Sequence, residues 1–292
     1  MGGATADFVF FLFLTGIALA GVIGGPLSGF IMSKLAGLNG WAGWQWMFLI
    51  EGLPSVLLGF LVIVMLDDRI ADAKWLSDDE RALLTANIDG DTAHKEEASV
   101  FTVLTSARVW LMALIYFSYV MGLYGVSFWL PTIIKAMGVA DPLQIGLMSA
   151  IPYGVAVIAM LLVARSADRL RERRWHVAIP GLLGAVGLLL SVLWSHDTVL
   201  AMAALTLATA GILTSLPLFW SLPTAFLTGT GAAAGIAMIN SLGNLSGFTS
   251  PFAVGWLKQA TGSTDAGMYL LAGSLVVGAL LTLSVPARMV NK

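Results

Sequence analysis

The sequence contains no cysteine, which excludes disulfide bonds, thiolate metal sites and cysteine nucleophiles. Charge is also scarce: only 11% of the residues are charged, and the net charge of −2 is spread over the connections between apolar segments. Such a distribution offers no surface for nucleic acid. The three histidines, His94, His176 and His196, lie in or beside these connections without the spacing of metal ligands, and we interpret them as solvated. No cofactor or metal is expected.

Hydrophobic residues, by contrast, make up 58% of the chain, and uninterrupted apolar stretches recur from end to end. Stretches of about 20 apolar residues are long enough to cross a bilayer as helices. A transmembrane β-barrel would instead need short segments that alternate polar and apolar residues. The sequence therefore predicts an all-α, polytopic membrane protein. Eight spans are expected, at about 8–33, 47–66, 110–134, 143–164, 177–194, 198–220, 232–257 and 267–287.

Lysine and arginine predict the orientation of these spans, because basic residues in short loops remain cytoplasmic. Only Lys34, Lys135 and Lys258 fall on one side of the predicted membrane. The other side receives Arg69, Lys74, Arg81, Lys95, Arg108, Arg165, Arg169, Arg171, Arg173, Arg174, Arg288 and Lys292. This asymmetry predicts a multi-pass protein of the plasma (inner) membrane with both termini in the cytoplasm. The first span resembles a secretory signal at 18–20, but it lacks a basic region before it and continues too far.

One polar segment, residues 67–107, interrupts the hydrophobic pattern and holds most of the acidic residues. It divides the chain into two spans before it and six after it. Ser77 followed three residues later by Glu80 is typical of a helix N-terminus. We therefore expect a cytoplasmic linker that contains one short helix.

Glu51 is the only charged residue within any predicted span. Intramembrane charges often mark proton pathways. However, an acid in the first turn of a helix is also stabilised by the positive end of the helix dipole. Because the predicted span begins at 47, we favour this structural interpretation over a proton relay.

Small residues within the spans predict close helix packing. Gly21, Gly25 and Gly29 recur every fourth residue, so they share one face of the first span, where another helix backbone can approach. Pro26 lies within the same stretch and is expected to bend it.

Polar and aromatic side chains at membrane depth are the candidate binding residues. Asn240 and Asn244 lie one helical turn apart, and an amide without a partner is costly there. Tyr124, Tyr153 and Trp220 carry hydrogen-bonding groups on aromatic rings. Tyr116 is expected to share a helix face with either Tyr119 or Tyr124. Each of these residue types is more often a packing contact than a ligand-binding group, so only their combination suggests a wet cavity. An enzyme is not expected, because no His, Asp or Lys accompanies the serines within a span.

The connection at 165–174 resembles the loop signature of the major facilitator superfamily, in which an Asp-Arg pair precedes an Arg-Arg pair. Asp168, Arg169, Arg173 and Arg174 supply these charges here. By resemblance, they form a cytoplasmic charge clamp that is remade during alternating access. The signature glycines are replaced, by Ala164 and Arg171, so a looser turn is expected.

Four further stretches resemble the anion:cation symporter family of that superfamily. They are Gln45 to Pro54, Ala71 to Leu76, Phe128 to Thr132, and Gly235 to Asn244. The resemblance implies symport of small organic anions, usually with protons, and Arg173 to His176 is most like the tartrate-type members. It also implies that Asn240, Trp220 and Tyr124 face the substrate. No obligate protein partner is implied; the bilayer, a small organic anion and H⁺ are the expected partners.

Against the family's twelve helices, the eight spans match helices 5–12. Residues 1–66 then correspond to the last two helices of the N-terminal bundle, 67–107 to the central cytoplasmic loop, and 108–292 to a complete C-terminal bundle of six helices. The family's anion-pairing arginine and proton-coupling carboxylate lie in the first four helices. Two alternatives stay open: a truncated, non-functional product, and a proton-coupled drug exporter, because 21–29 resembles an element of such exporters.

Overall fold

The computed structural model describes residues 2–73, 75–93, 105–227 and 229–291. All regular elements in this part of the chain are helical, which confirms the predicted all-α fold. They are α1 (Gly2–Lys34), η1 (Leu38–Gly40), α2 (Gly43–Met65), η2 (Ile70–Asp72), α3 (Asp78–Ala93), α5 (Ala107–Ala136), α6 (Pro142–Leu170), α7 (Arg174–Leu193), α8 (Thr198–Phe219), α9 (Ser221–Thr224), α10 (Gly229–Asn244), α11 (Ser246–Thr261), α12 (Asp265–Ser284) and α13 (Ala287–Val290).

Seven helical stretches in the described residues are long and apolar enough to cross a membrane. The predicted span at 232–257 differs from the others, because the structure divides it into α10 and α11, of 16 residues each. The break lies at Leu245, whose N–H donates to the carbonyl of Leu242, three residues earlier instead of four. The predicted span is therefore interrupted by one residue, Leu245.

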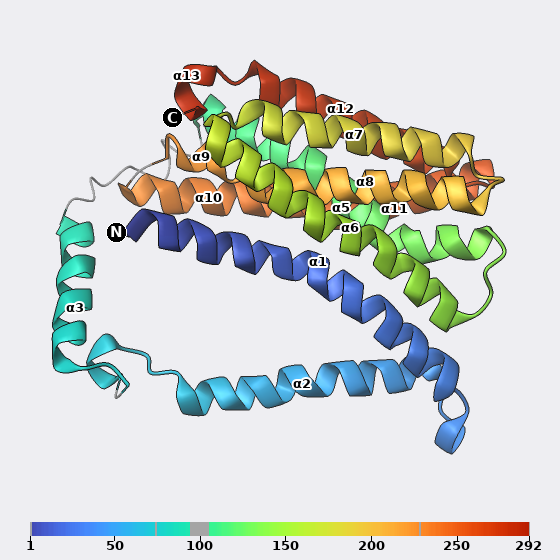
Figure 1. The fold of residues 1–292 in the computed structure, drawn as a ribbon, viewed down its shortest axis with the longest axis horizontal. Coiled ribbons are helices and arrows are strands. Elements are labelled where there is room, and N and C mark those ends of the chain that lie inside the picture. Colours follow the sequence, from blue (N-terminus) through green and yellow to red (C-terminus); the bar gives the residue numbers. More distant parts are fainter. Residues whose placement is uncertain (1, 74, 94–104, 228, 292) are drawn as a thin grey trace.

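The long helices run side by side, and their connections gather at two ends of the molecule (Figure 1). We call these the Lys34 end, where α1 is followed by α2 and α5 by α6, and the Arg173 end, where α6 is followed by α7. Lys34, Lys135 and Lys258 all belong to the last turns of helices that finish at the Lys34 end. The described arginines of the 165–174 connection lie at the opposite end.

The core lies among α5, α7, α8 and α12 and is built from large side chains between closely spaced backbones. Tyr119, Leu205 and Leu271, from three different helices, are fully buried. Glycine permits the close spacing: a Cβ at Gly211 of α8 would collide with the backbone of Pro180 and Gly184 of α7. In lipid, such small-residue contacts replace the hydrophobic effect as the main source of helix association.

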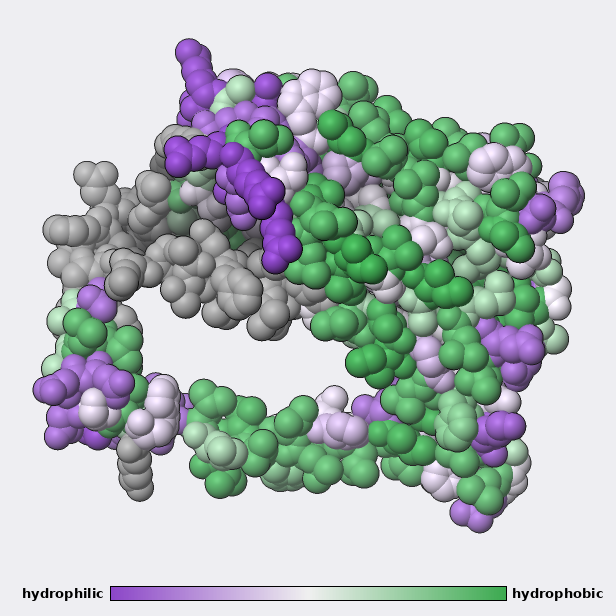
Figure 2. All heavy atoms as spheres, in the orientation of Figure 1, coloured by the Kyte–Doolittle hydropathy of each residue, from purple (hydrophilic) through white to green (hydrophobic). Residues whose placement is uncertain are grey.

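α1 packs along α6, whereas α2 packs on α1 and lies away from the remaining bundle (Figure 1). No residue of the apolar window of α2 is buried. Figure 2 shows hydrophobic residues along the length of α2, with hydrophilic ones concentrated around α3 and the ends of the bundle.

The predicted short helix in the polar segment is confirmed as α3. The N–H of Ser77 donates to the Glu80 carboxylate at 3.0 Å, and the N–H of Glu80 donates to the Ser77 hydroxyl at 3.4 Å. These two reciprocal bonds form a capping box. Hydrogen bonds from the backbone and side chain of Ser77 hold the pKa of Glu80 below its usual value.

Candidate functional site

The clearest polar group within the bundle joins α5 to α10. The hydroxyl of Tyr124 donates to the side-chain oxygen of Asn244 at 3.1 Å. The Asn244 amide in turn donates to the side-chain and backbone oxygens of Asn240, both at 2.9 Å. Asn240 and Asn244 remain exposed although they belong to an apolar helix. Three of the five predicted binding residues are therefore linked by hydrogen bonds, and two of them, Asn240 and Asn244, have exposed side chains.

Trp220 belongs to an aromatic cluster next to this group. The ring of Tyr116 stacks on Phe219 with centroids 5.0 Å apart and meets Trp220 edge-on at 4.9 Å. Gly243 of α10 faces the Tyr116 ring, so the aromatic cluster packs against the helix that carries both asparagines. Packed aromatic rings beside amide groups give a surface that can bind both the apolar and the polar parts of a small solute.

The tyrosines of α5 divide between two sides of that helix. Gly243 of α10 faces Tyr116, and Gly247 of α11 faces Tyr124. Tyr119 is instead fully buried, with its hydroxyl 3.4 Å from both the Val177 carbonyl and the Thr282 hydroxyl. Of the two expected pairs, Tyr116 with Tyr124 is the one that shares a face, and Tyr119 has a packing role.

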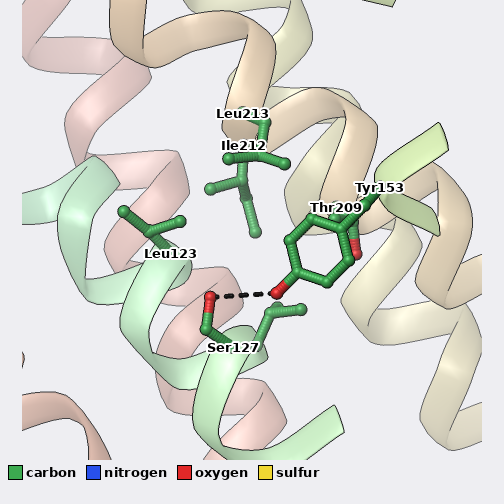
Figure 3. A pocket seen from close by; sticks show the side chains of 7 residues that line it. Leu123, Ser127, Tyr153, Thr209, Ile212 and Leu213 are labelled. Carbon is green, nitrogen blue, oxygen red and sulfur yellow. Dashed lines mark hydrogen bonds between the residues drawn. The ribbon is translucent and has the colours of Figure 1, made fainter. Parts of the chain in front are cut away.

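Tyr153, the fifth predicted binding residue, lies apart from the asparagines. Its hydroxyl donates to the Ser127 hydroxyl at 3.1 Å, which joins α6 to α5 (Figure 3). Thr209 and Ile212 of α8 border the same small pocket, which has no room for a water molecule. The ring also packs against Gly21 of α1, where a Cβ would collide with it.

The glycines of α1 lie against α6 at the backbone. A Cβ at Gly25 would approach the Gly146 carbonyl oxygen to 2.9 Å, and one at Gly29 would collide with the Pro142 carbonyl. Pro26, where a bend was expected, lies inside α1 and does not end the helix. Beyond these contacts, the Ser33 hydroxyl donates to the Asp141 carboxylate at 3.2 Å. α1 and α6 are therefore joined closely near the Lys34 end.

The charged connection between α6 and α7 contains one ion pair from the predicted motif. Arg173 lies 3.0 Å from the Asp168 carboxylate, while Arg169 is exposed. Arg171, which stands at a signature glycine, adopts the left-handed conformation with φ 49° and ψ 33°. The turn is therefore tight, and the looser turn expected from the substitution is wrong; the arginine adopts the conformation that glycine takes without steric cost.

Arg174 reaches across to α12 instead of pairing with an acid. Its Nη1 donates to the carbonyls of Leu283 at 3.1 Å and Val285 at 2.8 Å. The last carbonyls of a helix have no partners within it, so this side chain caps α12.

Glu172 links the same connection to the chain near Asn291. Asn291 donates to Glu172 at 3.0 Å, and its side-chain oxygen accepts the Arg173 N–H at 2.9 Å. His176 lies 3.3 Å from Glu172 and 3.0 Å from the Ser166 hydroxyl, so its interpretation as a solvated residue is wrong. Burial of Glu172 acts to raise its pKa, but hydrogen bonds from Asn291, the Trp175 backbone and His176 outweigh this and lower the pKa.

Sequence reasoning missed Ser127, Ser28 and Asn291, which make three of the polar contacts between elements. A single serine or asparagine gives no periodic pattern, although Ser127 lies one turn beyond Tyr124 on α5. Among the described residues, no cluster of three or more His, Asp or Glu could hold a metal ion.

A bundle of long apolar helices that contact one another at the backbone is the architecture of a polytopic membrane protein. The chain belongs to the Major Facilitator Superfamily, which it matches over residues 7–251. It is a multi-pass membrane protein.

Three similar proteins are named as transport proteins. A protein of Agrobacterium vitis named as a tartrate transporter is 46% identical over 93% of this chain and 63% of its own length. The metabolite transport protein NicT of Pseudomonas putida is 40% identical over 96% of this chain and 65% of its own length. A quinolone resistance transporter of Acinetobacter baumannii is also 40% identical, over 95% of this chain and 64% of its length. The chain thus spans less than two thirds of the length of these relatives.

Proposed function

We propose that this chain contributes to proton-coupled symport of small organic anions, with a tartrate-like dicarboxylate as substrate. The observation that carries the proposal is the group formed by Tyr124, Asn244 and Asn240. Amide and phenol groups are suitable donors to a carboxylate, and Asn240 and Asn244 are exposed at a depth where an unpaired amide is costly. The similarity to a tartrate transporter supports the same substrate class.

In this proposal, residues 1–66 and 108–292 belong to the two halves of a transporter, and 67–107 connects them. Asn240, Asn244, Tyr124 and Trp220 contact the anion from the second half, while Tyr153 lies where α6 meets α1. The protein lies in the inner membrane with its Arg173 end facing the cytoplasm, because the arginines at that end outnumber the three lysines at the Lys34 end. The charges of Asp168, Arg169, Arg173 and Arg174 then change partners during alternating access.

Tartrate binding to the purified chain tests the proposal. Isothermal titration calorimetry in detergent is expected to show binding that weakens tenfold or more in Asn240→Ala, because a hydrogen bond to a charged group is worth about 1.5–3 kcal/mol. Asn87→Ala is the matched control, since Asn87 is an exposed asparagine on α3, outside the bundle. Equal loss in both variants, or none in either, would contradict the proposed site.

Drug export is the second candidate, favoured by the similarity to a quinolone resistance transporter. Tyr116 and Trp220, the two partly exposed rings of the aromatic cluster, are suited to planar, lipophilic rings. Competition separates the two candidates: displacement of bound tartrate by malate but not by a quinolone supports the anion site. Quinolone binding that tartrate does not displace supports the exporter.

A further inference from the structure

A cavity of about 260 Å³ lies where α1, α5 and α6 meet. Most of its wall is glycine, proline and aliphatic, but four hydroxyl groups line it, from Ser28, Ser127, Ser149 and Tyr153. A cavity needs only about 10–15 Å³ to hold one water molecule, provided that polar partners are present. This cavity therefore has room and partners for a cluster of water molecules.

Glu51 is connected to the wall of this cavity. The hydroxyl of Ser28 donates to its carboxylate at 2.6 Å, so a single hydroxyl group separates the acid from the cavity. α2 begins at Gly43, eight residues before Glu51, or about 12 Å along the helix axis. The helix dipole acts on the first turn only. The interpretation of Glu51 as a first-turn acid is therefore wrong, and its placement needs another explanation.

The surroundings of Glu51 contain little other charge. α1 is the helix that packs against α2, and between Gly16 and Lys34 its only charged residue is Lys34, at its end. Asp141, which binds Ser33, and Lys135, in the last turn of α5, also lie at the Lys34 end. Among the described residues, no cation lies within ion-pair distance of Glu51.

Further hydroxyl groups of the cavity wall come from α5 and α6. Ser127 and Tyr153 are hydrogen-bonded to each other across α5 and α6, and both line the cavity. Ser149 lies one turn before Tyr153 on α6. Hydroxyl groups from α1, α5 and α6 therefore line the cavity, and one of them, that of Ser28, binds Glu51.

We propose that Glu51 is a proton-binding site supplied through Ser28 and water in this cavity. A proton from the surrounding solution enters the cavity water; Ser28 passes its own hydroxyl proton to the carboxylate and takes one from the water, so that Glu51 becomes a neutral carboxylic acid and the water and serine are unchanged, and the reverse sequence returns the proton. A neutral side chain costs less than a charged one at membrane depth, so the proton state biases the movement of α1 and α2. The assignment of this proton to the transport cycle rests on the proposed symport function.

Infrared difference spectroscopy of the purified chain in lipid nanodiscs tests the proton site without any substrate. Acidification is expected to produce a carboxylic-acid band with a component that is lost in Glu51→Gln and retained in Asp141→Asn, the other serine-bound carboxylate joined to α1. Glutamine has the same shape as glutamate, and circular dichroism checks the fold of each variant. A band of wild-type size in Glu51→Gln would overturn the proposal.

The route is tested by hydrogen–deuterium exchange of the same band. Exchange is expected to slow several-fold in Ser28→Ala, which removes the hydroxyl between acid and cavity. It is expected to stay unchanged in Ser33→Ala, where a serine on the same helix binds Asp141 instead. Equal exchange in both variants would overturn the route through Ser28.

Calorimetry with tartrate, combined with a pH indicator, separates this inference from the proposed function. Tartrate binding with proton uptake that falls in Glu51→Gln supports both. Tartrate binding with unchanged uptake in Glu51→Gln overturns the role of Glu51 in coupling and leaves the anion site intact. An infrared band that depends on Glu51, without any tartrate binding, overturns the anion site and leaves the proton site intact.

Discussion

α8 and α2 have nearly the same hydropathy but opposite environments. The span that contains α8, Thr198–Thr224, has a mean hydropathy of 2.0 and α2 one of 2.3, yet 72% of the apolar part of the first and none of that of α2 is buried. α8 packs alanines and Gly211 against α7, whereas the Leu, Phe and Val side chains of α2 are exposed and its Gly59 meets nothing within 4 Å. Hydropathy therefore indicates that a helix belongs in a membrane but not whether it contacts protein there.

Glycine substitution in the two helices gives the strongest test of this contrast. Gly211→Leu is expected to cost at least about 3 kcal/mol of stability, because the side chain would displace the α7 backbone at Pro180. Gly59→Leu in α2 meets nothing within 4 Å and is expected to gain about 1 kcal/mol from helix propensity. Unfolding by SDS in mixed micelles, followed by circular dichroism, measures both; equal losses would contradict the contrast.

The contact between α1 and α6 can be broken in the same way. Gly25→Leu is expected to cost about 1–3 kcal/mol by forcing α1 from Gly146, while Gly24→Leu faces open space and serves as the control. The chain has no cysteine, so Ser33→Cys combined with Asp141→Cys reports on this contact alone. Crosslinking is expected to fall with Gly25→Leu and persist with Gly24→Leu. Retained crosslinking in both would show that α1 tolerates a side chain there.

The two sides of α5 differ in a further testable way. Tyr119→Phe is expected to lower stability by about 1 kcal/mol, because its buried hydrogen-bond partners Val177 and Thr282 lose a hydroxyl. Tyr124→Phe leaves no buried group without a partner, so it is expected to change tartrate affinity more than stability. Calorimetry and chemical unfolding of both variants distinguish the packed side from the binding side.

Much of this architecture could be predicted from local patterns, but the contacts between helices could not. The spans and the Ser77–Glu80 capping box depend on neighbours in sequence, and they were predictable. The helix break at Leu245 was not predictable, because leucine is not a helix-breaking residue. The hydrogen bond from Ser28 to Glu51 was not predictable either, because it joins residues 23 positions apart. The Ser127–Tyr153 pair depends on how α5 and α6 are rotated, which hydropathy does not specify. The candidate site was therefore predictable as a set of residues and not as an arrangement.

Backbone strain at Arg171, at the Arg173 end, predicts a small gain in stability on substitution, opposite in sign to the losses above. Arg171→Gly is expected to gain up to about 1 kcal/mol, because a left-handed conformation costs a residue with a Cβ roughly that much. Arg169→Gly, two residues earlier in the last turn of α6, is expected to lose stability since glycine is a poor helix former. Thermal unfolding that shows both variants destabilised would contradict the strain at Arg171.

The smallest expected effect is a dependence of stability on acid pH. The pKa of Glu172 is lower in the folded chain than its usual value of 4.5, so its stabilising contribution is present above pH 4.5 and is lost as the pH falls through the folded pKa. Thermal unfolding at neutral and acid pH should show a smaller loss on acidification in Glu172→Gln than in the wild type. An identical loss in both would assign the acid sensitivity to other carboxylates.

The link between Glu172 and Asn291 also has a consequence for how the protein is made. The two residues are 119 positions apart, and the carbonyls of Leu283 and Val285, which Arg174 binds, are likewise synthesised long after it. At about 5–20 residues per second, a ribosome needs roughly 6–24 s to synthesise the intervening chain. During that interval, the connection between α6 and α7 lacks these partners, so its contacts at this end of the bundle form only after α12 and Asn291 have been synthesised.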